Sequence, residues 1–182
     1  MTIAVKKHEA ALEQTTASPE TAQIEVWKGE FGREYTDRNT FDIDALNALY
    51  RGNYGVTRSE INQTFLREIP STASFLEVGC NTGNQLLLLQ QMGYRNLSGI
   101  ELQPYALEIA RSRTQNISLR QGSALSIPHE DQSFDVVFTS GVLIHISPGD
   151  LPRVMIGRSV RYRVRDLEEY CERMARTTIS PA

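Results

Sequence analysis

The segment Phe75-Leu-Glu-Val-Gly-Cys-Asn-Thr-Gly83 carries the strongest fold signal in this chain of 182 residues. A short apolar run ends in glycines, and a mostly apolar stretch from Asn84 to Met92 follows it directly. Glycines at the end of a strand let backbone amides at the start of the next helix approach a ligand closely. The segment therefore predicts a strand, a ligand-binding loop and a helix, in that order.

Short apolar runs alternate with longer helical stretches through the middle of the chain. The expected strands cover residues 75–78, 97–100, 117–120 and 135–138, and the expected helices between them cover 84–92 and 104–113. Strands that alternate with helices form parallel sheets that are covered by helices on both faces. We therefore expect an α/β, Rossmann-like, mostly parallel sheet in which ligands bind beyond the carboxyl ends of the strands.

The length of the chain favours a single globular domain, because 182 residues are too few for two full-sized domains. In the N-terminal part we expect a helix that begins at Ser59 as its N-cap and stops at Pro70. The sequence divides into four expected segments: a mobile tail (1–24), a helical N-terminal cap (25–70), a core (71–150) and a short basic C-terminal extension (151–182).

Composition and charge argue against several classes of protein. The net charge of −3 gives no general attraction to nucleic acid. The apolar stretches are much shorter than the roughly 18 residues that cross a bilayer, so no membrane partner is expected. Cys80 and Cys171 are far apart and lie in no His-rich cluster, which argues against a disulfide framework and against a metal site. We expect a cytoplasmic protein without a bound metal.

The spacing of the glycines separates two kinds of nucleoside-containing cofactor. Glu101 ends the second expected strand about 20 residues after the loop, where a carboxylate can accept the hydroxyls of a ribose. A dinucleotide-binding loop has glycines at its first, third and sixth places, which here hold Gly79, Asn81 and Asn84. Because two of these three places lack glycine, the loop does not predict a dinucleotide.

The loop instead resembles motif I of class I methyltransferases, which has an acid, any residue and then three glycines at alternate places. Asn81 stands at the middle glycine, which asparagine tolerates because it adopts positive φ more readily than most residues. Residues 121–128 resemble the third motif of that family, with Ser123 at the usual acid, and residues 133–145 resemble the fourth strand and its exit loop.

The resemblance implies S-adenosylmethionine as the cofactor. The residues expected to contact it are Glu77, Gly79, Cys80, Asn81, Gly83, Glu101, Leu102, Ser123, Ala124 and Ser140. A sulfonium methyl is already electrophilic, so such an enzyme must align the acceptor and remove its proton. His145 follows the fourth strand, and histidine is a common proton acceptor in catalysis, which makes His145 the candidate base. The alternative is a histidine that only packs in a helix.

The N-terminal segment resembles a bacterial group, the pseudaminic acid biosynthesis-associated methylases. The resemblance lies in residues 27–39, which read Trp-Lys-Gly-Glu-Phe-Gly-Arg-Glu-Tyr-Thr-Asp-Arg-Asn, and in 50–57. It implies that Tyr35 and Arg38 close over the cofactor or over an anionic acceptor, against the alternative of cap packing and a surface charge. The implied function is methyl transfer to a small molecule, namely a sugar or nucleotide-sugar in bacterial surface-glycan synthesis.

Residues 151–182 are too few for the rest of the methyltransferase fold, so we expect a C-terminally shortened sheet. Arginines at 158–165 alternate with apolar side chains, which fits one exposed strand, a solvated edge or sequence unrelated to the family. The far wall of the acceptor site would then come from a second subunit, which points to a homodimer. The competing hypothesis is a non-catalytic cofactor-binding remnant or regulatory module.

Overall fold

The computed structural model describes residues 21–146. The first helix, α1 (Ala22–Lys28), begins inside the segment that we expected to be a mobile tail. Thr21 accepts a hydrogen bond from the amide of Ile24 and so caps this helix, and the Ile24 side chain is buried. The tail prediction is therefore wrong for residues 22–24. Residues 1–20 of the expected tail and the whole basic extension lie outside the described residues.

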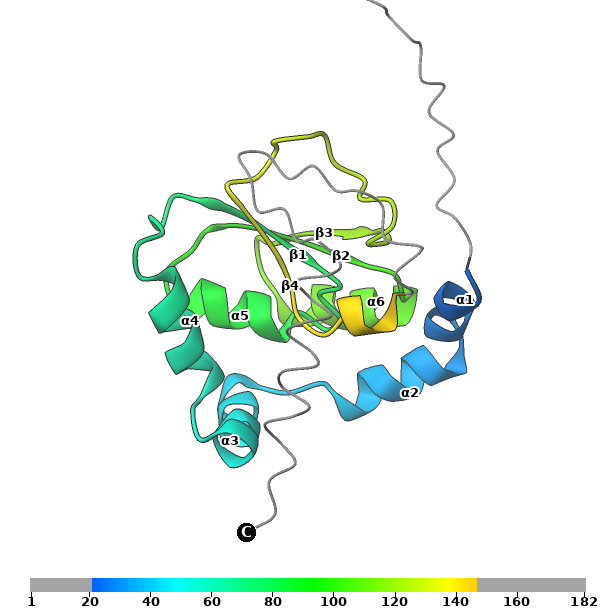
Figure 1. Ribbon diagram of the computed structural model, residues 1–182, viewed down its shortest axis with the longest axis horizontal. Helices are drawn as coiled ribbons and strands as arrows, with labels where there is room; N and C mark the ends of the chain where they lie inside the picture. Colours follow the sequence, from blue (N-terminus) through cyan, green and yellow to red (C-terminus); the bar gives the residue numbers. More distant parts are fainter. Residues whose placement is uncertain (1–20, 147–182) are drawn as a thin grey trace, which may run out of the picture.

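Within residues 21–146 the sheet has four parallel strands in the order β3-β2-β1-β4 (Figure 1). The strands are β1 (Ser74–Val78), β2 (Asn96–Glu101), β3 (Ser118–Gln121) and β4 (Val136–Thr139). This arrangement confirms the predicted Rossmann-like α/β fold, with strand ends displaced by only a residue. The chain moves from β1 to β3 in one direction and then returns to the other side of β1. Ligands bind in such folds where the strand order reverses, between the ends of β1 and β4.

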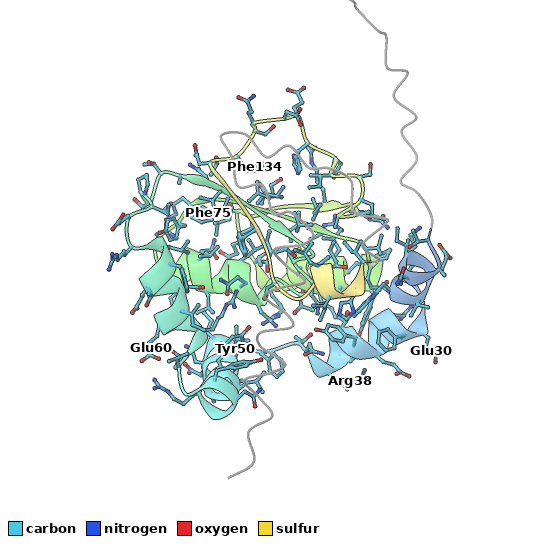
Figure 2. The ribbon with its side chains drawn as sticks, viewed as in Figure 1. Glu30, Arg38, Tyr50, Glu60, Phe75 and Phe134 are labelled. Carbon is cyan, nitrogen blue, oxygen red and sulfur yellow. The ribbon has the colours of Figure 1, made fainter. Side chains whose placement is uncertain are left out.

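Helices and a long loop cover the two faces of the sheet differently. The helices α5 (Asn84–Gln91) and α6 (Pro104–Arg113) follow β1 and β2 and lie on one face. Phe75 is fully buried on that face among residues of α5. On the other face, the loop 122–135 places Phe134 against the sheet (Figure 2). In the described part of the chain, this loop takes the place of the helix layer that we expected on the second face.

The N-terminal helices lie on the helical side of the sheet (Figure 1). After α1 come α2 (Glu30–Arg38), α3 (Ile43–Tyr54) and α4 (Arg58–Leu66), which bear out the expected helical character of this part. α3 packs against α4 and α5, whereas α2 packs against α1 and α6. α1 and α2 therefore reach the end of the sheet where β2 meets α6.

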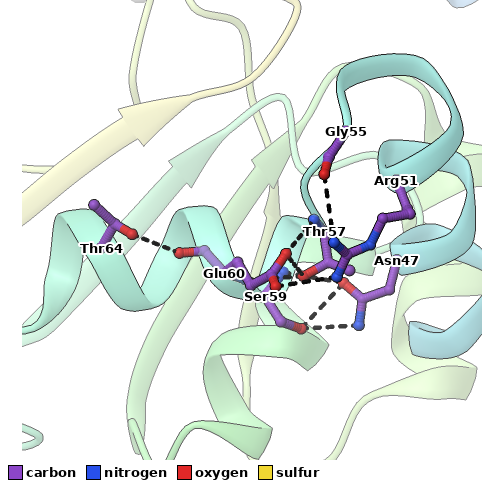
Figure 3. A network of polar contacts seen from close by, with 7 residues as sticks. All are labelled: Asn47, Arg51, Gly55, Thr57, Ser59, Glu60 and Thr64. Carbon is purple, nitrogen blue, oxygen red and sulfur yellow. Dashed lines mark hydrogen bonds and ion pairs between the residues drawn. The ribbon is translucent and has the colours of Figure 1, made fainter.

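The N-cap of α4 differs from the prediction. Thr57, rather than Ser59, caps the helix, because the Thr57 hydroxyl accepts from the Glu60 amide while the Glu60 carboxylate accepts from the Thr57 amide (Figure 3). Ser59 lies inside the helix and exchanges hydrogen bonds with Asn47 of α3. The capping box fixes where α4 begins, and Ser59 fastens α4 to α3.

Candidate active site

A cavity lies at the carboxyl ends of the strands, between the sheet and the helices α1 and α2. Its wall includes nine residues that the sequence predicted for the site, namely Tyr35, Gly79, Asn81, Glu101, Leu102, Ser123, Ala124, Ser140 and His145. These residues come from α2 and from the loops after all four strands. The fold thus brings together residues that are up to 110 positions apart between Tyr35 and His145.

The glycine loop after β1 has a backbone that few side chains tolerate. Gly79 and Gly83 have φ values of 77° and 76°, and Asn81 has a φ of 45°. A Cβ atom on Gly79 would lie 2.2 Å from Cγ2 of Val142, so the loop after β4 packs directly on this glycine. Gly79 therefore permits both the turn and the close approach of the two loops that border the cavity.

Glu101 is held by three backbone amides at the end of β2. Its carboxylate accepts from the amides of Asn81 at 2.8 Å, Leu102 at 2.8 Å and Gln103 at 2.9 Å. Burial raises the pKa of Glu101, although these amide donors act in the opposite direction. The carboxylate is thereby fixed on the cavity wall, and it links the glycine loop to the loop after β2. A carboxylate in this position suits the two hydroxyls of a ribose.

Ser123 and Ala124 border the cavity in the loop after β3. Ser123 is buried, and its hydroxyl accepts from the amide of Leu125 at 3.1 Å. Ser123 also forms an isolated β-bridge with Ser126. The serine at the place of the family's acid therefore stabilises the turn that presents Ala124, in addition to lining the cavity.

His145 belongs to an aromatic group at one end of the cavity. Its ring centroid lies 4.6 Å from that of Trp27, whose ring also meets Tyr35 at 5.0 Å and Phe31 at 5.1 Å. Trp27 lines the cavity but was not predicted as a site residue, although the density of aromatic residues around it was a signal. The structure places His145 both on the cavity wall and in ring packing, so its role as a base stays a prediction.

Four predicted residues do not line the cavity. Glu77 and Cys80 are buried beneath it, and Cys80 packs in the core between the sheet and α5. Gly83 is the N-cap of α5. Arg38 lies on the outer side of α2 (Figure 2), where it pairs with Glu34 at 3.5 Å. The structure therefore does not bring Arg38 to the site, since the helix turns its side chain toward solvent.

Glu77 is a buried acid next to the glycine loop. Its side chain is only 3% exposed, and burial raises its pKa to about 8. Arg58 partly opposes this effect, and Glu101 adds to it. In the described part of the chain, Oε2 of Glu77 has no hydrogen-bond partner. Burial therefore favours the neutral form of this side chain.

The described residues, 21–146, also bear on other kinds of function. No group of three or more histidines, cysteines or acids in this range is arranged to hold a metal ion. No helix in the same range is long and apolar enough to span a membrane.

Comparisons with known proteins support the class that the fold and loops indicate. Residues 75–161 match a family described as "Methyltransferase domain". The chain is 34% identical over 108 residues to an uncharacterized methyltransferase of Staphylococcus carnosus (strain TM300), covering 58% of this chain and 48% of that protein. It is 30% identical over 106 residues to an uncharacterized methyltransferase-like protein of Schizosaccharomyces pombe, covering 57% of this chain and 41% of that protein.

A solved structure shares the fold over a longer part of the chain. It is a Haemonchus contortus phosphoethanolamine N-methyltransferase in complex with phosphoethanolamine and S-adenosylhomocysteine, with a TM-score of 0.51 and 20% identity over 70% of this chain and 27% of that one. Residues 75–161 therefore match a methyltransferase domain, and the likeness to this solved structure concerns the fold. The chain spans less than half the length of the two curated relatives named above.

Proposed function

We propose that the chain transfers a methyl group from S-adenosylmethionine to a small molecule. The observation that carries this proposal is the fixed Glu101 carboxylate, which faces the same cavity as the glycine loop and the Ser123 loop. S-adenosylmethionine contains a ribose, a nucleobase and an amino-acid moiety, and these three parts match the three neighbouring loops. The cavity also lies where the strand order reverses, which is where this fold class binds ligands.

The residues that border the cavity suit the parts of this cofactor. Glu101 accepts the ribose hydroxyls, and the Ser123 and Ala124 loop meets the adenine edge. The glycine loop lines the cavity beside these residues through Gly79 and Asn81, where it would hold the methionine end. When bound, the cofactor supplies a methyl group on a sulfonium, which reacts without further activation. The protein therefore has to orient the acceptor and take its proton.

His145 is the proposed base for the acceptor proton. It lies on the cavity wall after β4, and its ring rests on Trp27 at 4.6 Å between centroids. This contact limits the rotation of the imidazole, which favours a single orientation toward the acceptor. The aromatic surface of Trp27 and Tyr35 then forms the adjoining wall.

We propose a sugar or nucleotide-sugar as the acceptor and a role in bacterial surface-glycan synthesis, in the cytoplasm. These proposals rest on the resemblance of residues 27–39 and 50–57 to the pseudaminic acid-associated methylases. The contact that the resemblance implied for Arg38 is left out, because Arg38 pairs with Glu34 on the outer side of α2. Completion of the acceptor site by a second copy of the chain is part of the same proposal.

Calorimetric titration with S-adenosylhomocysteine tests the cofactor site. The full chain should bind, and Glu101→Ala should weaken binding by at least about tenfold, since a hydrogen bond to a charged group contributes about 1.5–3 kcal/mol. Glu108→Ala is the matched control, because Glu108 is an exposed acid on α6. Absence of binding to the unmodified chain, or equal binding by Glu101→Ala, would contradict the proposal.

Methyl transfer itself needs a second measurement. Labelled S-adenosylmethionine is incubated with the full chain and a panel of nucleotide-sugars, and the products are identified by mass spectrometry. A labelled sugar supports the proposed acceptor. Cofactor binding without transfer to any member of the panel favours the non-catalytic remnant instead.

A further inference from the structure

We propose that Gln103 is a positioning residue that holds the N-terminal helices against the cofactor site and thereby sets the Trp27 ring beside His145. The α1–α2 elbow comprises residues 27–30, where α1 ends at Lys28 and α2 begins at Glu30. The consequence of this arrangement for methyl transfer rests on the proposed function, whereas the arrangement of the helices is independent of it.

Gln103 connects two helices that are far apart in sequence. Its side chain is buried, and its Nε2 lies within hydrogen-bonding distance of the carbonyls of Trp27 at 3.1 Å, Lys28 at 2.7 Å and Gly29 at 3.1 Å. The last carbonyls of a helix have no partner within that helix, so this amide caps the end of α1. Its Oε1 accepts from the Tyr105 amide at 3.3 Å and so caps the start of α6.

Gly32 packs closely against the end of α1. A Cβ atom on Gly32 would lie 1.9 Å from the carbonyl oxygen of Trp27 and 3.2 Å from Nε2 of Gln103. Only glycine therefore allows α2 to approach the end of α1 while Gln103 occupies the space between them. The same contact offers a way to displace the elbow without changing Gln103.

A second tie fastens the other end of the same segment. The Thr36 hydroxyl on α2 lies 3.1 Å from Oδ1 of Asn81 in the glycine loop, and Thr36 is 2% exposed. Asn81 in turn donates its amide to Glu101. The two contacts that hold the N-terminal helices are thus made by Gln103 and Asn81. The backbone amides of both residues also donate to the Glu101 carboxylate.

These contacts connect the carboxylate that we assign to the ribose with the aromatic end of the cavity. Trp27 lies in the last turn of α1, beside the carbonyls that Gln103 caps. A shift of the elbow would separate the Trp27 ring from His145 and Tyr35. Trp27 is also the single tryptophan of the chain, so its fluorescence reports the position of the elbow directly.

The test uses two variants that disturb the elbow from opposite sides in the full chain. Gln103→Glu keeps the length of the side chain and an oxygen for α6 but removes the donor, while Gly32→Ala inserts a methyl group against the Trp27 carbonyl. The matched controls are Gln91→Glu, at an exposed position in α5, and Gly52→Ala, where an added Cβ meets nothing within 4 Å.

We expect Trp27 emission to move to longer wavelength and acrylamide quenching to increase in Gln103→Glu and in Gly32→Ala. Both controls should keep the emission of the unmodified chain. Far-UV circular dichroism establishes which variants are folded, and either elbow variant decides the result if the other does not fold. An unchanged Trp27 signal in a folded elbow variant would overturn the proposal.

Ligand binding supplies the functional part of the test. S-adenosylhomocysteine should bind Gln103→Glu about tenfold more weakly, as expected when one or two net hydrogen bonds are lost, and should bind Gln91→Glu like the unmodified chain. Equal affinity in Gln103→Glu would overturn the link between the elbow and the cofactor site. If the unmodified chain does not bind, the proposed function fails, whereas the fluorescence comparison still decides the role of Gln103.

Discussion

Replacement of Glu77 by glutamine should make the protein more stable at neutral and alkaline pH. Burial raises the pKa of this acid from 4.5 to about 8, so the folded protein holds a proton that the unfolded chain releases above pH 4.5. Its contribution to stability is therefore fully present below pH 4.5, declines as the pH rises and is lost above about pH 8. Glutamine has the same shape and cannot ionise, which removes this loss.

The size of the effect follows from the difference between the pKa of Glu77 in the unfolded chain and in the folded protein. At about 1.36 kcal/mol for each pKa unit, the loss of stability is about 3 kcal/mol at pH 7 and approaches about 5 kcal/mol above pH 8. Glu77→Gln should thus match the unmodified protein near pH 4.5 and exceed it increasingly as the pH rises. The missing partner of Oε2 supports this expectation, because no described donor holds the charged form at that atom.

Urea unfolding between pH 4.5 and 9, followed by Trp27 fluorescence and circular dichroism, measures the difference in free energy of unfolding. Glu108→Gln on the exposed side of α6 is the control, and its difference from the unmodified protein should stay nearly constant with pH. A constant difference for Glu77→Gln would mean that Glu77 titrates alike in both states. A difference that falls with rising pH would show that Arg58 keeps the carboxylate charged in the folded protein, contrary to the argument.

Three further outcomes test local parts of the structure. Thr57→Ala should lower the free energy of unfolding by about 1 kcal/mol through loss of the α4 capping box, and more than Thr64→Ala, as urea titration can compare. Gly83→Ala should destabilise by about 1–2 kcal/mol because its φ is 76°, whereas Gly52→Ala should stabilise α3 by about 0.5–1 kcal/mol; thermal melts check the opposite signs. His145→Ala should reduce turnover by about a hundredfold while S-adenosylhomocysteine binding stays nearly unchanged, and normal turnover would leave only packing for His145.

Local patterns in the sequence were sufficient for the central part of the fold. The alternation of apolar runs and helical stretches located all four strands to within a residue or two, because each element is specified by its own side chains. Glu101 and the glycine loop were found for the same reason, since their spacing is local. The capping box is also readable in the sequence as Thr57 followed three residues later by Glu60, a spacing that specifies the start of α4 better than Ser59 does.

Contacts between distant segments could not be predicted in this way. Gln103 lies 74 to 76 residues from the carbonyls that it caps, and nothing around it in the sequence distinguishes it from any glutamine before a helix. The predicted contact of Arg38 with the site was wrong for a related reason. The way α2 packs on α6 decides which of its side chains face the cavity, and Arg38 faces away from it. Trp27 likewise reaches the site through a contact between distant segments, since its ring packs against His145 after β4.

Asn81 shows how one substitution in a loop can be compensated by its surroundings. In isolation, asparagine at the middle glycine carries the cost of a positive φ, here 45°. In the fold, its amide donates to Glu101 and its side chain accepts from Thr36 of α2, two contacts of which glycine could make only the first. The exchange thus adds a tie between the glycine loop and the N-terminal helices. In this chain the loop serves to hold the wall of the cavity as well as to approach a ligand.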